Sequence, residues 1–105
     1  MKLNVYVNEN MYQVDVPEHM LLDAESIYAK IDSDLDKGWQ MSREWIQELN
    51  TRQRCQVVAD RLLTAIESEN EPSTMLMAGY IMTRMPGIQT VHIATDGDIL
   101  QTQLV

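Results

Sequence analysis

Phenylalanine is absent from this 105-residue sequence, cysteine occurs once and glycine occurs only four times. A single cysteine forms no internal disulfide, and it leaves the sequence without a Cys pair for a zinc or iron–sulfur centre. Each glycine already has a structural use: Gly38 and Gly87 end expected helices, Gly97 makes a turn, and Gly79 allows helices to approach closely. No glycine therefore remains to cradle phosphate, and no Gly-x-Ser-x-Gly elbow occurs, so nucleotide binding and elbow-type hydrolysis lose their sequence support.

Basic residues are also scarce, because eight Lys and Arg stand against sixteen Asp and Glu, a formal charge of −8. Such a charge repels phosphate backbones and anionic lipid headgroups, so we expect neither a nucleic-acid partner nor a membrane partner. Long apolar runs are missing as well, which argues against a signal peptide and against a membrane span of about 20 residues. One cysteine and eight methionines suit a reducing compartment, and we therefore predict a cytoplasmic protein.

The two ends of the chain have the apolar alternation of β-hairpins. A chain of 105 residues can bury one two-layer core, so residues 1–105 are expected to form a single α+β domain. Alternating apolar residues at 3–7 and 12–16 predict an N-terminal hairpin, and Asp96-Gly97 is a type I′ turn signal that predicts a C-terminal one. The expected pairs are Val7 with Tyr12, Val5 with Val14 and Leu3 with Val16 in the first hairpin, and Ala94 with Ile99, Ile93 with Leu100 and Val91 with Thr102 in the second.

Between the hairpins the apolar period changes to three and four residues, which is typical of amphipathic helices. One helix is expected from about Met20 until Gly38 stops it. A short helix should follow in the stretch WQMSREWIQELN, where the Ser42 side chain can cap a helix with Trp45 and Ile46 on its apolar side.

The strongest helix signal begins at Asn50 or Thr51, where Gln53 can return the cap interaction, and it continues to about Asn70. Its broad apolar arc indicates a helix in the middle of the fold. A last helix begins at Pro72. The expected fold class is α+β: an N-terminal β-hairpin, about three helices of which two are long with one short helix before the central one, and a C-terminal β-hairpin. The sheet should be antiparallel and packed on the helices, whether or not both hairpins share it.

The stretch DSDLDKGW places Asp32, Asp34 and Asp36 at the spacing of the first three ligands of a helix–loop–helix calcium site. Both geometric anchors of that motif are missing, since Lys37 stands where the turn glycine belongs and Arg43 where the bidentate glutamate belongs. A solvated helix end with its carboxylates toward water explains the same residues better. We therefore expect no metal site and no cofactor, and keep the three aspartates only as candidates for weak divalent-cation binding.

Cys55 stands near Arg52 and Arg54 in the first turns of the central helix, a setting that lowers a thiol pKa. It also lies on the apolar flank of that helix with Val58 and Leu62, where burial would raise the pKa and block access. Packing is the favoured interpretation. His19 and His92 have no companion at ligand spacing.

No arrangement of residues points to catalysis, and we expect a protein that is not an enzyme. Apolar residues exceed what one sheet face can cover, which favours a protein–protein interaction or regulatory module that self-associates. The expected partner is a second copy in a homodimer, or else another protein. Flexible thioethers also suit partner surfaces. The interface candidates are Trp39, Met41, Trp45, Met75, Met77 and Met82.

Two other functions remain open on the sequence alone. One is weak divalent-cation binding at Asp32, Asp34 and Asp36. The other is an acidic decoy that occupies the basic groove of a nucleic-acid-binding protein, and it predicts aligned carboxylates over one broad face.

Overall fold

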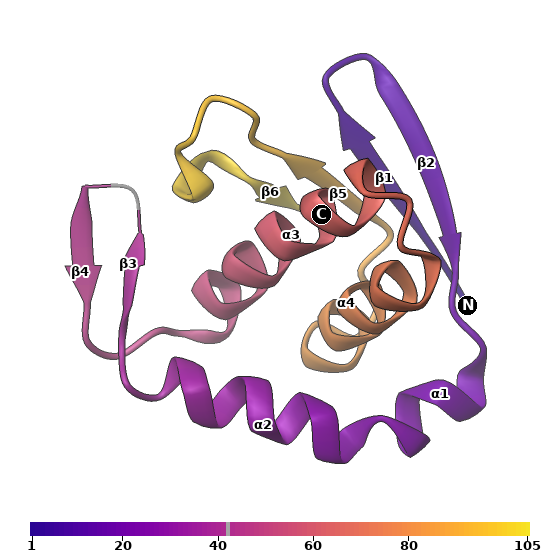
Figure 1. Ribbon diagram of the computed structural model, residues 1–105, viewed down its shortest axis with the longest axis horizontal. Helices are drawn as coiled ribbons and strands as arrows, with labels where there is room; N and C mark the ends of the chain where they lie inside the picture. The colour runs from indigo at the N-terminus through magenta and orange to yellow at the C-terminus, as the bar shows by residue number, and fades with distance from the viewer. Residues whose placement is uncertain (42) are drawn as a thin grey trace.

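The computed structural model describes residues 1–41 and 43–105, and it has the expected α+β architecture. A four-stranded sheet is covered on one face by helices, and a small second hairpin stands to one side (Figure 1). In chain order the elements are β1 (Lys2–Val7), β2 (Asn10–Asp15), α1 (Glu18–Asp23), α2 (Glu25–Leu35), β3 (Trp39–Met41), β4 (Glu44–Ile46), α3 (Thr51–Glu67), α4 (Glu71–Arg84), β5 (Thr90–Ile93), the 3-10 helix η1 (Ile99–Gln101) and β6 (Gln103–Leu104).

Both terminal strand pairs belong to one sheet, in the order β2-β1-β5-β6. The central contact, between β1 and β5, is parallel, with Val5 beside Val91. This corrects the expectation of a purely antiparallel sheet. The crossover between these two strands contains α1, α2, α3 and α4, and parallel neighbours require such a long connection.

The N-terminal hairpin forms, but its register is two residues away from the expected one. Leu3 pairs with Val14 and Val5 pairs with Tyr12, because the loop is only Asn8 and Glu9. Asn8 adopts a φ of 56°, a left-handed conformation that asparagine tolerates better than most residues. A shift of two residues keeps every side chain on its face of the sheet, so Leu3, Val5 and Val14 are still buried.

The predicted C-terminal type I′ hairpin is wrong in its loop and register. Val91 pairs with Leu104 rather than Thr102, and residues 94–102 form a long connection that contains η1. Polar side chains hold this connection in place of a strand ladder: Gln56 Nε2 donates to the carbonyl oxygens of Leu100 and Thr102 at 3.2 and 3.0 Å. The Thr102 hydroxyl accepts from the Ala94 amide at 3.1 Å.

The short helix expected within residues 42–49 is replaced by the β3–β4 hairpin, and its proposed cap, Ser42, lies outside the described residues. Gly38, with a φ of 91°, turns the chain out of α2. A Cβ at Gly38 would lie 2.8 Å from the Trp45 ring and 2.9 Å from the Ile46 carbonyl oxygen. Trp39, Trp45 and Ile46 are aromatic or β-branched residues, which favour strands, and this preference outweighs the weak helical period of the segment.

The helices otherwise follow the sequence closely. The capping box of α3 is present, with Asn50 accepting from the Gln53 amide and the Gln53 side chain accepting from the Asn50 amide. The expected first helix is divided at Ala24 into α1 and α2, which together wrap around the helical side below α4 (Figure 1). Within the described residues, no helix has the length and apolar character needed to cross a bilayer.

The core lies between the inner face of the sheet and α3, with α4 beside α3 and α2 outside them. The fully buried residues of α3 include Cys55, Val58 and Leu62. A helix in contact with neighbours on two sides needs such a wide apolar arc, and the prediction of a central helix is confirmed.

Candidate functional site

The densest polar contact of the described chain is centred on Asp32, in the middle of α2. Tyr80 Oη donates to Asp32 Oδ1 at 2.5 Å, and Arg54 Nη1 lies 3.3 Å from the same oxygen. Arg84 donates to Asp32 Oδ2 through Nη2 at 2.7 Å and through Nε at 3.1 Å. One carboxylate on α2 therefore receives donors from both α3 and α4.

Each arginine also has a second acidic partner at the rim of this cluster. Arg84 Nη2 lies 3.2 Å from Glu25 Oε1, and Arg54 Nη2 lies 2.5 Å from Asp36 Oδ1. The Arg54 side chain also donates to the carbonyl oxygen of Leu49 at 3.1 Å. The arginine side chains are about one-fifth exposed, so the cluster ties three helices together at the surface of the core.

The ionisation of this cluster is stable around neutral pH. Burial alone would raise the pKa of Asp32, but hydrogen bonds from Tyr80, Arg84 and Arg54 outweigh it and hold that pKa below its usual value. Burial and the hydrogen bond to Asp32 raise the pKa of Tyr80. Burial would lower the pKa of Arg84, yet its bonds to Glu25 and Asp32 raise it. These three groups are therefore not suited to proton transfer near pH 7.

A cavity of about 430 Å³ opens beside the cluster, lined by Asp32, Thr51, Arg54, Thr83 and Arg84. Its two arginines suggest an anion site, but three carboxylates, those of Glu25, Asp32 and Asp36, are bound to them. The local charge is thus negative, and the guanidinium groups already have internal acceptors. The arrangement is that of a structural clamp rather than an anion receptor.

The three candidate calcium ligands point toward different partners. Asp32 binds Arg84 and Arg54, Asp34 binds Lys30 at 2.6 Å, and Asp36 binds Arg54. The expectation that all three face water is wrong for Asp32, whose side chain is only 28% exposed. In the parts of the chain that the structure describes, no three His, Cys, Asp or Glu residues are placed to hold a metal ion. This geometry gives no support to the weak-cation alternative.

Cys55 packs in the core directly behind this cluster and has no exposed surface. Burial, together with the negative charge of Asp32, raises the pKa of its thiol to about 12, although the positive charge of Arg84 opposes the shift. Arg52 and Arg54 point elsewhere, to the Leu104 carbonyl oxygen and to the aspartates of α2. The packing interpretation of Cys55 is confirmed.

We predict that Cys55 is unreactive in the native protein. A pKa of about 12 in place of the ordinary value near 8.5 lowers the thiolate fraction at pH 7 by a factor on the order of 1000. Labelling by a chromogenic disulfide reagent at pH 7 should therefore be slower by at least that factor in the native chain than in the urea-unfolded chain. The Cys55→Ala variant provides the blank, and a native rate equal to the unfolded rate would contradict the buried placement.

The interface candidates divide into covered and exposed residues. Met41 and Met82 are buried, and Met75 and Met77 are half-buried against the core. Trp39 is half-buried, and the central carbon of the Arg61 guanidinium lies 5.2 Å from the centroid of the Trp39 ring. Only Trp45 is largely exposed, at 57%. The apolar excess of the sequence is thus mostly used inside the fold.

Sequence reasoning missed the main partners of Asp32, because Tyr80 and Arg84 are about 50 residues away along the chain and no local pattern links them to α2. It also missed a group of acids around the α3–α4 turn, which the alternation Glu67, Glu69, Glu71 makes visible in the sequence. These acids line a groove beside β2.

Comparison with known proteins adds no functional residue to these. No protein-family model, no curated protein and no solved structure matches this chain.

Proposed function

We propose that this chain is a non-enzymatic protein-binding module that works in the cytoplasm and associates with a second copy of itself. The observation that carries the proposal is Trp45, which lies on β4 with 57% of its surface exposed. Among the described residues β4 pairs with β3 on one side only, and its other edge is the outermost part of the molecule (Figure 1). An exposed tryptophan on an open strand edge is a template for pairing with another chain.

A second copy fits this edge by symmetry. If β4 pairs antiparallel with its copy about Trp45, the two indole rings lie opposite each other on one face of the enlarged sheet. In this register Glu44 faces Ile46 of the other copy, and Arg43 faces Gln47. No like charges then stand opposite each other, which removes the main obstacle to pairing two acidic chains.

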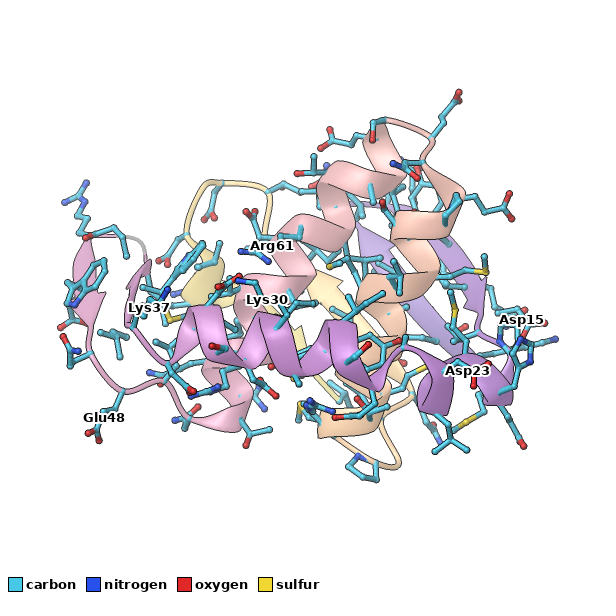
Figure 2. All side chains as sticks on the ribbon, turned by 60° about the horizontal axis from the view of Figure 1, so that its bottom comes forward. Asp15, Asp23, Lys30, Lys37, Glu48 and Arg61 are labelled. Atoms are coloured by element: carbon cyan, nitrogen blue, oxygen red, sulfur yellow. The ribbon has the colours of Figure 1, made fainter. Side chains whose placement is uncertain are left out.

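Charges of both signs lie at this end of the molecule. Lys30, Lys37 and Arg61 lie in the half nearer the hairpin, where Glu48 is the labelled acid, whereas Asp15 and Asp23 lie at the opposite end (Figure 2). Arg43 and Glu44 of the hairpin also line a pocket with Asp96 and Asp98, so a second copy meets basic as well as acidic groups at this end.

The pKa shifts in and beside the Asp32 cluster support a function other than catalysis. The pKa of Asp32 is lowered and those of Tyr80 and Cys55 are raised, so each moves away from neutrality. The buried free thiol of Cys55 supports placement in a reducing compartment.

We expect sedimentation equilibrium at micromolar concentrations to give a mass above the 12.1 kDa of one chain. Trp45→Ser should raise the dimer dissociation constant about 30-fold or more, because a central interface tryptophan contributes about 2 kcal/mol or more. Trp45 is exposed, so the variant should keep its fold, which circular dichroism would verify.

The matched control is Leu22→Ser on α1, which removes an apolar side chain that is 81% exposed and far from the hairpin. It should leave the dimer unchanged. A native protein that sediments only at 12.1 kDa would overturn self-association, and a dimer lost with Leu22→Ser but kept with Trp45→Ser would overturn the β4 edge as its interface.

A further inference from the structure

The opposite edge of the main sheet is also open. β2 is the first strand in the order β2-β1-β5-β6, so only its inner side is paired within the described residues. Four consecutive positions of β2, residues 12–15, line a groove of about 570 Å³. We call this the β2 groove, and its other lining residues are Ile66, Glu67, Glu69, Glu71, Thr74 and Met75.

The floor of the β2 groove is apolar. Val14 is buried, and Ile66 and Met75 are half-buried against the core. Val14 and Tyr12 are two residues apart and thus face the helical side of the sheet, and Tyr12 still exposes 41% of its surface. A strand added along β2 would place every second side chain over this floor.

The rim of the β2 groove is acidic on the side formed by the α3–α4 turn. Glu69 has a left-handed φ of 55°, and the Asn70 amide donates back to the Ala65 carbonyl oxygen at 2.9 Å. This tight turn brings Glu67, Glu69 and Glu71 to the lining of the groove. In the described part of the chain these three carboxylates form no ion pair.

We propose that the β2 groove binds an extended segment of another protein that carries basic and apolar residues at alternate positions. The segment adds a fifth strand to the edge of β2 through main-chain hydrogen bonds. Its inward apolar side chain covers Val14, Ile66 and Met75, and Lys or Arg two positions away reaches the carboxylates of the rim. This inference goes beyond self-association, and it rests on the proposed function in that the chain is taken to bind proteins.

Charge decides between this occupant and a second copy of the chain. Two β2 strands paired with each other would bring two acidic rims to one interface, with no basic residue of either groove to balance them. A basic segment gains from the same carboxylates.

The test uses the full chain with Trp45→Ser, so that pairing at β4 does not interfere. The probe is the blocked peptide Thr-Lys-Thr-Val-Thr-Lys-Thr, which places two Lys and one Val on one face of a strand. Amide chemical shifts measured during a titration should change mainly at residues 11–15 and 66–75. A peptide with the same composition, Thr-Thr-Lys-Val-Lys-Thr-Thr, places both Lys on the strand face opposite Val and should bind about tenfold or more weakly.

Paired protein variants test the acidic rim. Glu69→Gln combined with Glu71→Gln should weaken binding of the alternating peptide about tenfold, because it removes two charge contacts. The control, Glu44→Gln with Glu48→Gln, removes the same charge at the hairpin and should leave affinity unchanged.

Equal binding of the two peptides, or equal effects of the two protein variants, would overturn the β2 groove as a specific site. A Trp45→Ser chain that dimerises with its β2 amides protected from exchange would overturn the choice of occupant. If the native chain is monomeric and the peptide binds as described, self-association fails while this inference stands. If the native chain dimerises through Trp45 and the peptide does not bind, only this inference fails.

Discussion

Replacing Asp32 with asparagine should lower the free energy of unfolding by about 2–3 kcal/mol. The carboxylate accepts from Tyr80, Arg84 and Arg54, and a neutral amide leaves two guanidinium groups short of an acceptor. Breaking a fully buried pair costs about 3–5 kcal/mol, and the loss is smaller here because Asp32 is 28% exposed and both arginines keep a second acid. Urea denaturation at pH 7 measures the change.

Asp34→Asn is the matched control, since Asp34 lies about half a turn away on the same helix and its one ion pair within the described residues is with Lys30 at the surface. It should leave the denaturation midpoint almost unchanged. Equal effects of the two substitutions would mean that the cluster around Asp32 does not stabilise the fold.

The Asp32 variant should also change the response to acid. Because the pKa of Asp32 is lowered in the folded chain, the carboxylate contributes its full stability above the ordinary aspartate value of 3.8. That contribution is lost as the pH falls from there through the lowered folded pKa. The native chain should therefore lose stability more steeply below about pH 4 than Asp32→Asn does.

Gly79→Ala should destabilise the chain by about 2 kcal/mol, even though alanine is the better helix former by about 1 kcal/mol. Gly79 lies on α4 where that helix meets α2, and an added Cβ would overlap the hydroxyl oxygen of Tyr28. The Tyr28 ring is fully buried and lies edge-on to the Tyr80 ring at 6.0 Å. A well-packed side chain of this kind has little room to move.

A second substitution isolates the cause of that loss. The Tyr28 hydroxyl has no hydrogen-bond partner among the described residues, so Tyr28→Phe alone should be neutral or stabilising by about 1 kcal/mol. In the Tyr28→Phe background the next contacts of the added Cβ lie at 3.3 and 3.4 Å, and Gly79→Ala should then be nearly neutral. The double-mutant cycle should give a coupling of about 2 kcal/mol, and a coupling near zero would contradict the collision.

The elements that could be predicted from the sequence are those whose signals are local. The capping box of Asn50 and Gln53 and the Pro72 helix start depend on residues within one turn, and both are present in the structure. The sequence predicts a helix in place of the β3–β4 hairpin because three-residue strands carry almost no apolar period, and Trp45 with Ile46 fits either structure.

Features that depend on contacts between residues far apart in the sequence could not be predicted from local patterns. The connection around Asp96 and Gly97 is held by Gln56, a buried glutamine on α3 that no turn signal anticipates. The Asp32 cluster likewise joins residues on three helices. Burial of Cys55 was predictable, because its helical position between apolar neighbours carried the information.

The parallel contact of β1 with β5 has a consequence for how the chain is made. Asn4 pairs with Thr90, so β1 leaves the ribosome well before its parallel partner β5. Until β5 arrives, the β1–β2 hairpin has both edges open, and an isolated two-stranded hairpin is marginally stable at best. The sheet is therefore completed only after β5 has been synthesised, and the nascent β1–β2 hairpin is the segment most exposed to misassociation during that interval.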